Sequence, residues 1–208
     1  MRFCLLVLAG FGMSGCALGL GDPTNTSFAT PTVTGFLDEV DSGARGGSDF
    51  SDETGNGYGY QVGAVDEDGL QGFAGLVPGA SVTAAPTSGA AVMTGQFELA
   101  AIKYIITNGT SVSGQSFLDR GDVSLNVDFA NGRVTGGGTG LDGGIVNIAL
   151  DNNELTVDGR FTGDRMTGTV TYDGVSGSLE GLAGSDEVIG SFHGHTDSAL
   201  FAGGFIAN

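Results

Sequence analysis

Hydrophobic and polar residues alternate over three stretches in the second half of the chain. In residues 121–129, GDVSLNVDF, apolar residues occupy every second position, and the same period recurs in ELTVDGRF at 154–161 and RMTGTVTY at 165–172. A period of two places successive side chains on opposite faces of an extended strand. These stretches therefore predict β-strands with one buried face and one solvent-facing face.

The same pattern along the chain predicts an antiparallel meander. Asn131-Gly132 and Asp173-Gly174 are dipeptides that favour two-residue hairpin turns. Predicted strands lie near 90–99, 122–129, 132–139, 144–150, 154–162, 165–172, 175–181, 187–194 and 199–206. Such a series avoids exposed edges most simply by closing on itself, so we expect an all-β fold, a closed antiparallel β-barrel of eight or nine strands.

The alternation also predicts which residues face inward. We expect glycines at 159 and 168 to give room where the wall curves. The expected interior includes Val127, Phe129, Leu155, Phe161, Val170 and Phe192. A transmembrane barrel would need strands of about nine to eleven residues and an outer aromatic girdle. Because the outward positions carry Thr, Asp, Arg and Ser and the chain has no tryptophan, we expect a soluble barrel with a wet outer face.

The first half of the chain divides into a leader, a tether and a glycine-rich region. Residues 1–15 combine one basic residue with an apolar run too short to span a bilayer, which is typical of a signal peptide. Residues 16–31 predict a flexible tether, and residues 32–89 an acidic, Gly-rich region with short strands, of which TVTGFL and GYGYQVGAV are the strand-like parts. The barrel is expected over residues 90–208.

A candidate lipidation site follows the leader. Met13-Ser14-Gly15-Cys16 resembles a bacterial lipobox, in which the cysteine is acylated and becomes the first residue of the exported chain. The alternative is an ordinary signal with an accidental cysteine. Acyl chains on Cys16 would anchor the protein stably. Ala17 follows instead of the aspartate that retains lipoproteins at the inner membrane in enteric bacteria, so we expect an outer membrane location.

The charge of the chain limits its partners. Seven basic residues stand against 24 acidic ones, giving a formal net charge of −17. Nucleic acid and bare anionic lipid are poor partners for such a field, so contact with the membrane is expected only through the lipid anchor. The acidic surface either keeps the protein solvated or attracts a basic partner.

Several segments together resemble one protein family. They are the lipobox, GLVPG at 75–79, VDFANGRVTG at 127–136, FTGDRMTGTV at 161–170 and the terminal GSFHG…AGGF. In this order they resemble the β-barrel domain of transferrin-binding protein B and related surface lipoproteins, in a short form with one lobe. His193 stands where the family often has tyrosine. The resemblance implies a lipid-anchored barrel, displayed on the cell surface, that binds a protein or a small solute; transferrin binding itself is not carried over.

Four residues are candidates for ligand binding. His193 and His195 lie two apart and so share one strand face, where they could approach a metal ion only with a further ligand such as Asp197; exposed histidines without a metal are the alternative. Lys103 precedes residues 106–121 and Arg120 lies near their end. We predict this stretch and the acidic stretch 38–69 to be the longest loops. Loops on a rigid scaffold carry recognition.

Catalysis and bound cofactors find little support in the sequence. The segment GGTGLDGGI at 137–145 is similar to a calcium-binding repeat, but it occurs once and is expected to form a hairpin loop. No Gly-x-Ser-x-Gly elbow joins a strand to a helix. Both histidines lie in one strand, two positions apart, so none is set apart in sequence to serve as the base for a nucleophile. We therefore expect a protein that is not an enzyme, with no metal and no cofactor.

Two functions remain open. The first is a surface-exposed lipoprotein that captures a protein or solute, linked to metal or nutrient uptake, with a TonB-dependent receptor as a candidate partner. The second is a periplasm-facing structural or envelope-interaction lipoprotein that captures no ligand.

Overall fold

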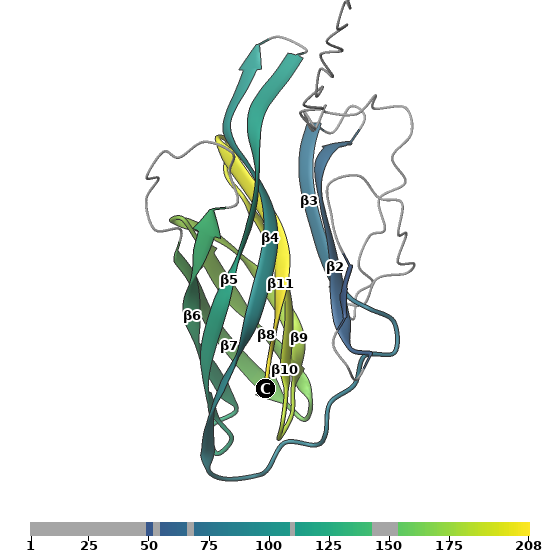
Figure 1. Ribbon diagram of the computed structural model, residues 1–208, viewed down its shortest axis with the longest axis vertical. Coiled ribbons are helices and arrows are strands. Elements are labelled where there is room, and N and C mark those ends of the chain that lie inside the picture. Colours follow the sequence, from purple (N-terminus) through teal and green to yellow (C-terminus); the bar gives the residue numbers. More distant parts are fainter. Residues whose placement is uncertain (1–48, 52–54, 66–68, 109–110, 143–153) are drawn as a thin grey trace, which may run out of the picture.

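The computed structural model describes residues 49–51, 55–65, 69–108, 111–142 and 154–208 (Figure 1). These residues form strands, turns and bends, and no apolar helix of membrane-spanning length occurs among them. The eleven strands are β1 (Asp49–Ser51), β2 (Gly57–Val65), β3 (Gly69–Leu76), β4 (Ala90–Asn108), β5 (Ser111–Asp128), β6 (Arg133–Asp142), β7 (Glu154–Thr162), β8 (Arg165–Tyr172), β9 (Val175–Ala183), β10 (Val188–His195) and β11 (Ala199–Ala207).

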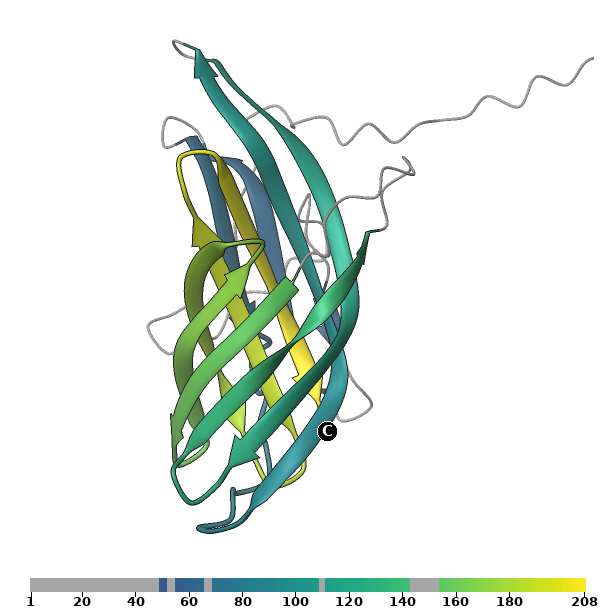
Figure 2. The same cartoon turned by 90° about the vertical axis from the view of Figure 1, so that its left-hand side faces the viewer.

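Eight of these strands close into a barrel in the order β10-β11-β4-β5-β6-β7-β8-β9. Every neighbouring pair is antiparallel, and the pairing of β10 with β9 completes the ring. The strands tilt steeply across the barrel wall (Figure 2). The predicted closed antiparallel eight-stranded barrel is thus confirmed, and of its predicted strands only 144–150 lies outside the described residues.

The two predicted hairpin turns differ in length. Tyr172 pairs with Val175, and both Asp173 and Gly174 have positive φ, as a two-residue turn requires. At the other site Asp128 pairs with Arg133, so the connection has four residues and only Gly132 has positive φ. The Asp128 carboxylate accepts hydrogen bonds from the backbone and side chain of Asn131, which stabilises the longer loop.

Apolar side chains fill the barrel interior. Phe192 is fully buried, and its ring centroid lies 6.0 Å from that of Phe201 and 6.3 Å from that of Phe205. At Gly168 an added Cβ would come within 2.2 Å of the Asp158 carbonyl oxygen, so this strand approaches its neighbour too closely for any side chain. The predicted interior residues Val127, Phe129, Leu155, Val170 and Phe192 are buried, and Phe161 packs partly buried against them.

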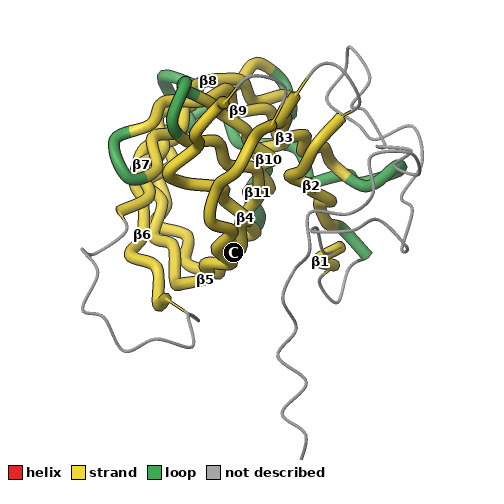
Figure 3. The backbone as a smooth tube through the Cα atoms, turned by 90° about the horizontal axis from the view of Figure 1, so that it is seen from above, coloured by secondary structure: helices red, strands yellow, loops and turns green. Residues whose placement is uncertain are grey.

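The outer wall of the barrel is not wet all round, which corrects the sequence-based expectation. A three-stranded sheet, β1-β2-β3, lies beside the barrel, and its β2 and β3 cover β10 and β11 (Figure 3). Tyr58 and Leu76 of this sheet pack against Ile102, Ile189 and Ile206 of the wall. Strand β11 is apolar on both faces, and β10 is buried on both faces up to Phe192, whereas β7 and β8 on the uncovered wall alternate between buried and exposed residues.

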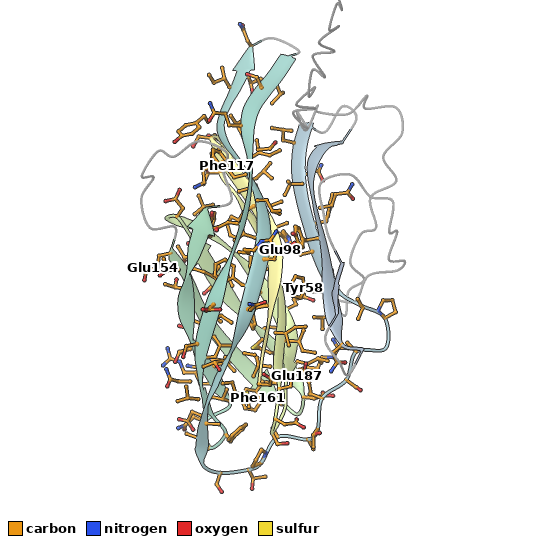
Figure 4. The ribbon with its side chains drawn as sticks, viewed as in Figure 1. Tyr58, Glu98, Phe117, Glu154, Phe161 and Glu187 are labelled. Carbon is orange, nitrogen blue, oxygen red and sulfur yellow. The ribbon has the colours of Figure 1, made fainter. Side chains whose placement is uncertain are left out.

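Polar contacts fasten the covering sheet to the barrel. The Asn56 amide donates to Glu187 Oε2 at 2.7 Å and to the Ser81 carbonyl at 2.8 Å, and its oxygen accepts from the Ser81 N–H. The Tyr60 hydroxyl donates to Glu98 Oε1 at 2.5 Å. Figure 4 shows Tyr58, Glu98 and Glu187 between the sheet and the barrel. Burial, together with the charge of Glu98, raises the pKa of the Tyr58 phenol well above its usual value.

The predicted loop 106–121 is instead a β-ribbon. Strand β4 continues to Asn108 and β5 begins at Ser111, so the two strands rise together beyond the rest of the barrel (Figure 1). Likewise, Gly137–Asp142 of the predicted calcium-like hairpin loop belongs to β6. The ribbon shows no alternation in its sequence because none of its described side chains is fully buried, although Ile105 packs partly buried against the cluster beneath the covering sheet.

Replacing Phe192 with alanine is expected to destabilise the barrel by about 3–5 kcal/mol, because a fully buried ring leaves a cavity among other rings. Urea unfolding followed by circular dichroism measures this loss. Val92→Ala is the matched control, since Val92 is 67% exposed. We expect the control to change the free energy of unfolding by about 0.5 kcal/mol or less. Equal effects of the two substitutions would contradict the packed interior.

Candidate functional site at the mouth of the barrel

One end of the barrel, here called the mouth, carries the β8–β9 turn, the β10–β11 turn and the ribbon. We define the ribbon as residues 104–108 of β4 and 111–118 of β5. Its pairing with neighbouring barrel strands ends at Lys103, opposite Ala199, and at Asp119, opposite Asp142. Beyond these residues a single further backbone bond, from Ile105 N–H to the Ser198 carbonyl, ties the described part of the ribbon to the barrel.

An ion pair spans the mouth. Lys103 Nζ on β4 lies 2.7 Å from Asp173 Oδ2, which directly follows β8. In the order of the barrel, β4 and β8 are four strands apart in either direction, so the contact joins opposite walls. The ammonium also lies 5.4 Å from the ring centroid of Phe117 and 5.2 Å from that of Tyr172. Two aromatic faces and a carboxylate therefore surround one cation.

A second polar contact crosses the barrel beside the first. The Tyr172 hydroxyl donates to Asp119 Oδ2 at 2.9 Å, and Asp119 is fully buried. A buried carboxylate needs such partners because desolvation of the charge is costly. The sequence analysis missed Asp119 by assigning it to a loop. Extending the alternation of β5 backwards from Val123 through Gly121 would have placed it on the inward face.

Positive φ angles accompany this ion pair. Among the described residues only two other than glycine have positive φ: Tyr104, with φ 56°, and Asp173, with φ 48°. Tyr104 directly follows Lys103, and Asp173 is the ion-pair partner of Lys103. Register shifts between Lys103 and Ile106, so Tyr104 and Ile105 together stand opposite Gly114 in a β-bulge. We call Lys103, Tyr104, Phe117, Asp119, Tyr172 and Asp173 the mouth cluster.

Arg120 lies apart from the mouth cluster. It pairs with Glu98 across β4 and β5, and Glu98 accepts the hydrogen bond from Tyr60 of the covering sheet. Residues 119 and 120 point to opposite faces of the wall, so Arg120 is exposed on the outside while Asp119 is buried inside. The structure therefore does not bring together Lys103 and Arg120, which the sequence analysis paired as flanks of one loop.

The two histidines lie on the outer face of β10, and not in the mouth cluster. His193 is half-buried, and its Nε2 lies 3.4 Å from the Ser178 hydroxyl, whereas His195 is exposed. Burial, and then the neighbouring His195, lowers the pKa of His193 below its usual value of 6.5. Within the described residues, no three His, Cys, Asp or Glu side chains are grouped so as to hold a metal ion. Cys16 lies outside the described residues.

A shallow groove of about 490 Å³ lies on the outer wall over β4, β5 and β6. Thr94, Gln96, Asp122 and Ser124 line it, and Gly137 forms part of its floor. These side chains are neutral or acidic. The groove is a polar surface feature separate from the mouth cluster.

Comparisons with known proteins find similarity to solved structures. No protein-family model matches the chain, and no curated protein is significantly similar in sequence. Among solved structures, a surface lipoprotein is 15% identical with a TM-score of 0.46, covering 80% of this chain and 83% of that one. A variant of the vaccine antigen transferrin-binding protein B from Actinobacillus pleuropneumoniae H49 is 16% identical with a TM-score of 0.49, covering 85% of this chain and 89% of that one.

A third similar structure is HpuA from Kingella denitrificans in complex with human haemoglobin. It is 17% identical with a TM-score of 0.33, and the match covers 73% of this chain and 55% of that one. At these identities the similarity is one of fold, and the ligands named for those proteins are not transferred to this chain.

The depressed pKa of His193 predicts a pH-dependent stability. Because an unfolded histidine has a pKa near 6.5, the unfolded chain takes up the proton first as the pH falls. His193 therefore contributes stability that is present above pH 6.5 and is lost as the pH falls through the lower, folded value. Urea unfolding between pH 7.5 and about pH 5.5 measures the loss, since carboxylates mostly titrate below that range. His193→Gln should remove this dependence of the free energy of unfolding on pH, and His195→Gln should reduce it. An unchanged pH dependence in His193→Gln would contradict the role given to His193.

Proposed function

We propose that this protein is an outer-membrane lipoprotein, anchored through Cys16 and displayed on the cell surface, whose barrel binds a partner protein through its mouth and ribbon. It acts as a binding module and not as a catalyst. The sequence leaves open a protein or a small solute as the ligand, and the proposal chooses the protein.

The observation that carries the proposal is the distribution of exposed apolar side chains. Four large hydrophobic side chains are exposed in the described structure, and three of them, Tyr104, Ile106 and Leu118, belong to the ribbon. Residues 104–118 also contain no charged residue, although the chain carries 24 acidic ones. Exposed apolar side chains on a segment free of charge are typical of protein contact surfaces.

The filled interior supports a ligand that binds outside the barrel. Aromatic rings occupy the centre, and the Lys103–Asp173 and Tyr172–Asp119 contacts cross the mouth above them. A small solute would have to displace these groups in order to enter. A protein can instead contact the projecting ribbon and the exposed edge of the mouth.

Protease added to intact cells should remove the protein, because the proposal places it on the cell surface. Cys16→Ser should release the protein from membranes, because Cys16 is the only cysteine that follows the leader. Immunoblots of whole cells and of membrane fractions measure both. Protection on intact cells, with digestion only after the outer membrane is opened, would favour the periplasm-facing alternative instead.

Shortening the ribbon should abolish partner capture without unfolding the barrel. Lys103 and Gln115 are directly paired, so residues 104–114 can be replaced by an Asn-Gly turn that joins them. We expect cross-linking on intact cells to recover a partner with the wild type and with Val92→Ser but not with the shortened protein. Circular dichroism and the melting temperature check that the barrel remains folded. Recovery of the same partner by the shortened protein would contradict the proposal.

A further inference from the structure

We infer that Tyr104 is an aromatic anchor that binds a lysine or arginine side chain of the partner protein. This inference rests on the proposed function, because it names the chemistry by which the mouth and ribbon recognise their partner. It concerns one side chain whose placement the fold itself does not explain.

The backbone of Tyr104 is held in a conformation that a tyrosine adopts only at a cost. At φ 56° the residue lies in the left-handed region, which is unfavourable by about 1–2 kcal/mol for side chains other than glycine, asparagine and aspartate. Burial of the ring does not repay this cost, because the residue is 60% exposed. Glycine at the same position would relieve the strain.

The bulge directs the tyrosine. Because Tyr104 and Ile105 together oppose Gly114, the phase of the strand changes between Lys103 and Ile106. β-bulges re-aim side chains and often lie beside functional sites. Strained residues cluster at such sites as well, and Tyr104 directly follows Lys103, which forms the ion pair with Asp173. Figure 4 shows the neighbouring Phe117 at the base of the ribbon, where it rises from the barrel.

The chemistry of the mouth and the net charge of the chain favour a cation as the bound group. The adjacent Lys103 is itself held by the rings of Phe117 and Tyr172 and by the carboxylate of Asp173, so the mouth already binds one ammonium group by this chemistry. The Asp173 side chain is 43% exposed and remains open to the outside. With a net charge of −17 the chain attracts basic surfaces, and a cation over an exposed ring adds attraction at short range.

Two short peptides test the inference directly. One is acetyl-Val-Lys-Val-Lys-Val-amide, and the other carries glutamine in place of both lysines. We expect the lysine peptide to shift the backbone amide signals of residues 105–107 saturably in NMR titrations, with an affinity that weakens as salt is added. The glutamine peptide should bind at least about threefold more weakly, the share expected of a cation–π contact at an exposed site.

Substitutions at Tyr104 separate binding from folding. Tyr104→Gly should lose about two- to fivefold in affinity for the lysine peptide. Its melting temperature should stay the same or rise, by up to about 4 °C, because strain relief offsets the extra chain entropy of glycine. Tyr104→Phe keeps a ring and should bind within about twofold of the wild type. Val92→Ser, which removes an exposed apolar side chain elsewhere on β4, should leave binding unchanged.

Several outcomes would overturn the inference. Equal binding of the two peptides, or undiminished binding by Tyr104→Gly, would mean that the ring does not recognise a cation. A fall of several degrees in the melting temperature of Tyr104→Gly would make Tyr104 a structural residue. If these occur while the shortened ribbon still loses its partner on cells, the ribbon binds by other chemistry and the proposed function stands.

Discussion

The closing strand β11 is buried on both of its faces, and the rest of the structure depends on this constraint. Phe201 and Phe205 point into the barrel, whereas Leu200 and Ile206 point outward and would be exposed without a cover. Burying both sets requires a closed barrel inside and the β1-β2-β3 sheet outside. At Gly204 an added Cβ would lie 2.3 Å from the Tyr58 ring, so the two layers meet without room for a side chain. Closure of the barrel and attachment of the sheet are thus two parts of one packing requirement.

The sequence predicts the barrel well wherever one face of a strand is buried and the other is wet. Strands β7 and β8 alternate because solvent lies on one side, and their predicted bounds, 154–162 and 165–172, are those of the structure. Strand β2 was also predicted at 57–65. Strand β3, GLQGFAGL, carries glycines that weaken a strand signal and was missed. The covered wall was missed because a strand buried on both faces shows an apolar run instead of alternation.

The candidate site was only partly predictable for a similar reason. Lys103 was singled out because basic residues are scarce, and it lies in the mouth cluster. Its partners could not be inferred, because Asp173 and Tyr172 come from the opposite wall and meet it only when the barrel closes. None of the described ribbon side chains is fully buried, so the ribbon shows no period and was taken for a loop. Tyr104 gave no signal at all, because its distinguishing property is a backbone angle.

A mouth braced in this way favours recognition by a preformed surface. The ion pair and the Tyr172–Asp119 hydrogen bond join strands that are not neighbours, so the walls at this end resist opening. The ribbon begins directly at Lys103 and inherits that rigidity at its base, while its outer part has few further bonds to the barrel. Binding groups that are already in place lose less conformational entropy when a partner docks. The strain at Tyr104 is tolerated because the braced barrel holds the preceding Lys103 in its ion pair with Asp173, and the exposed ring is in place before any partner arrives.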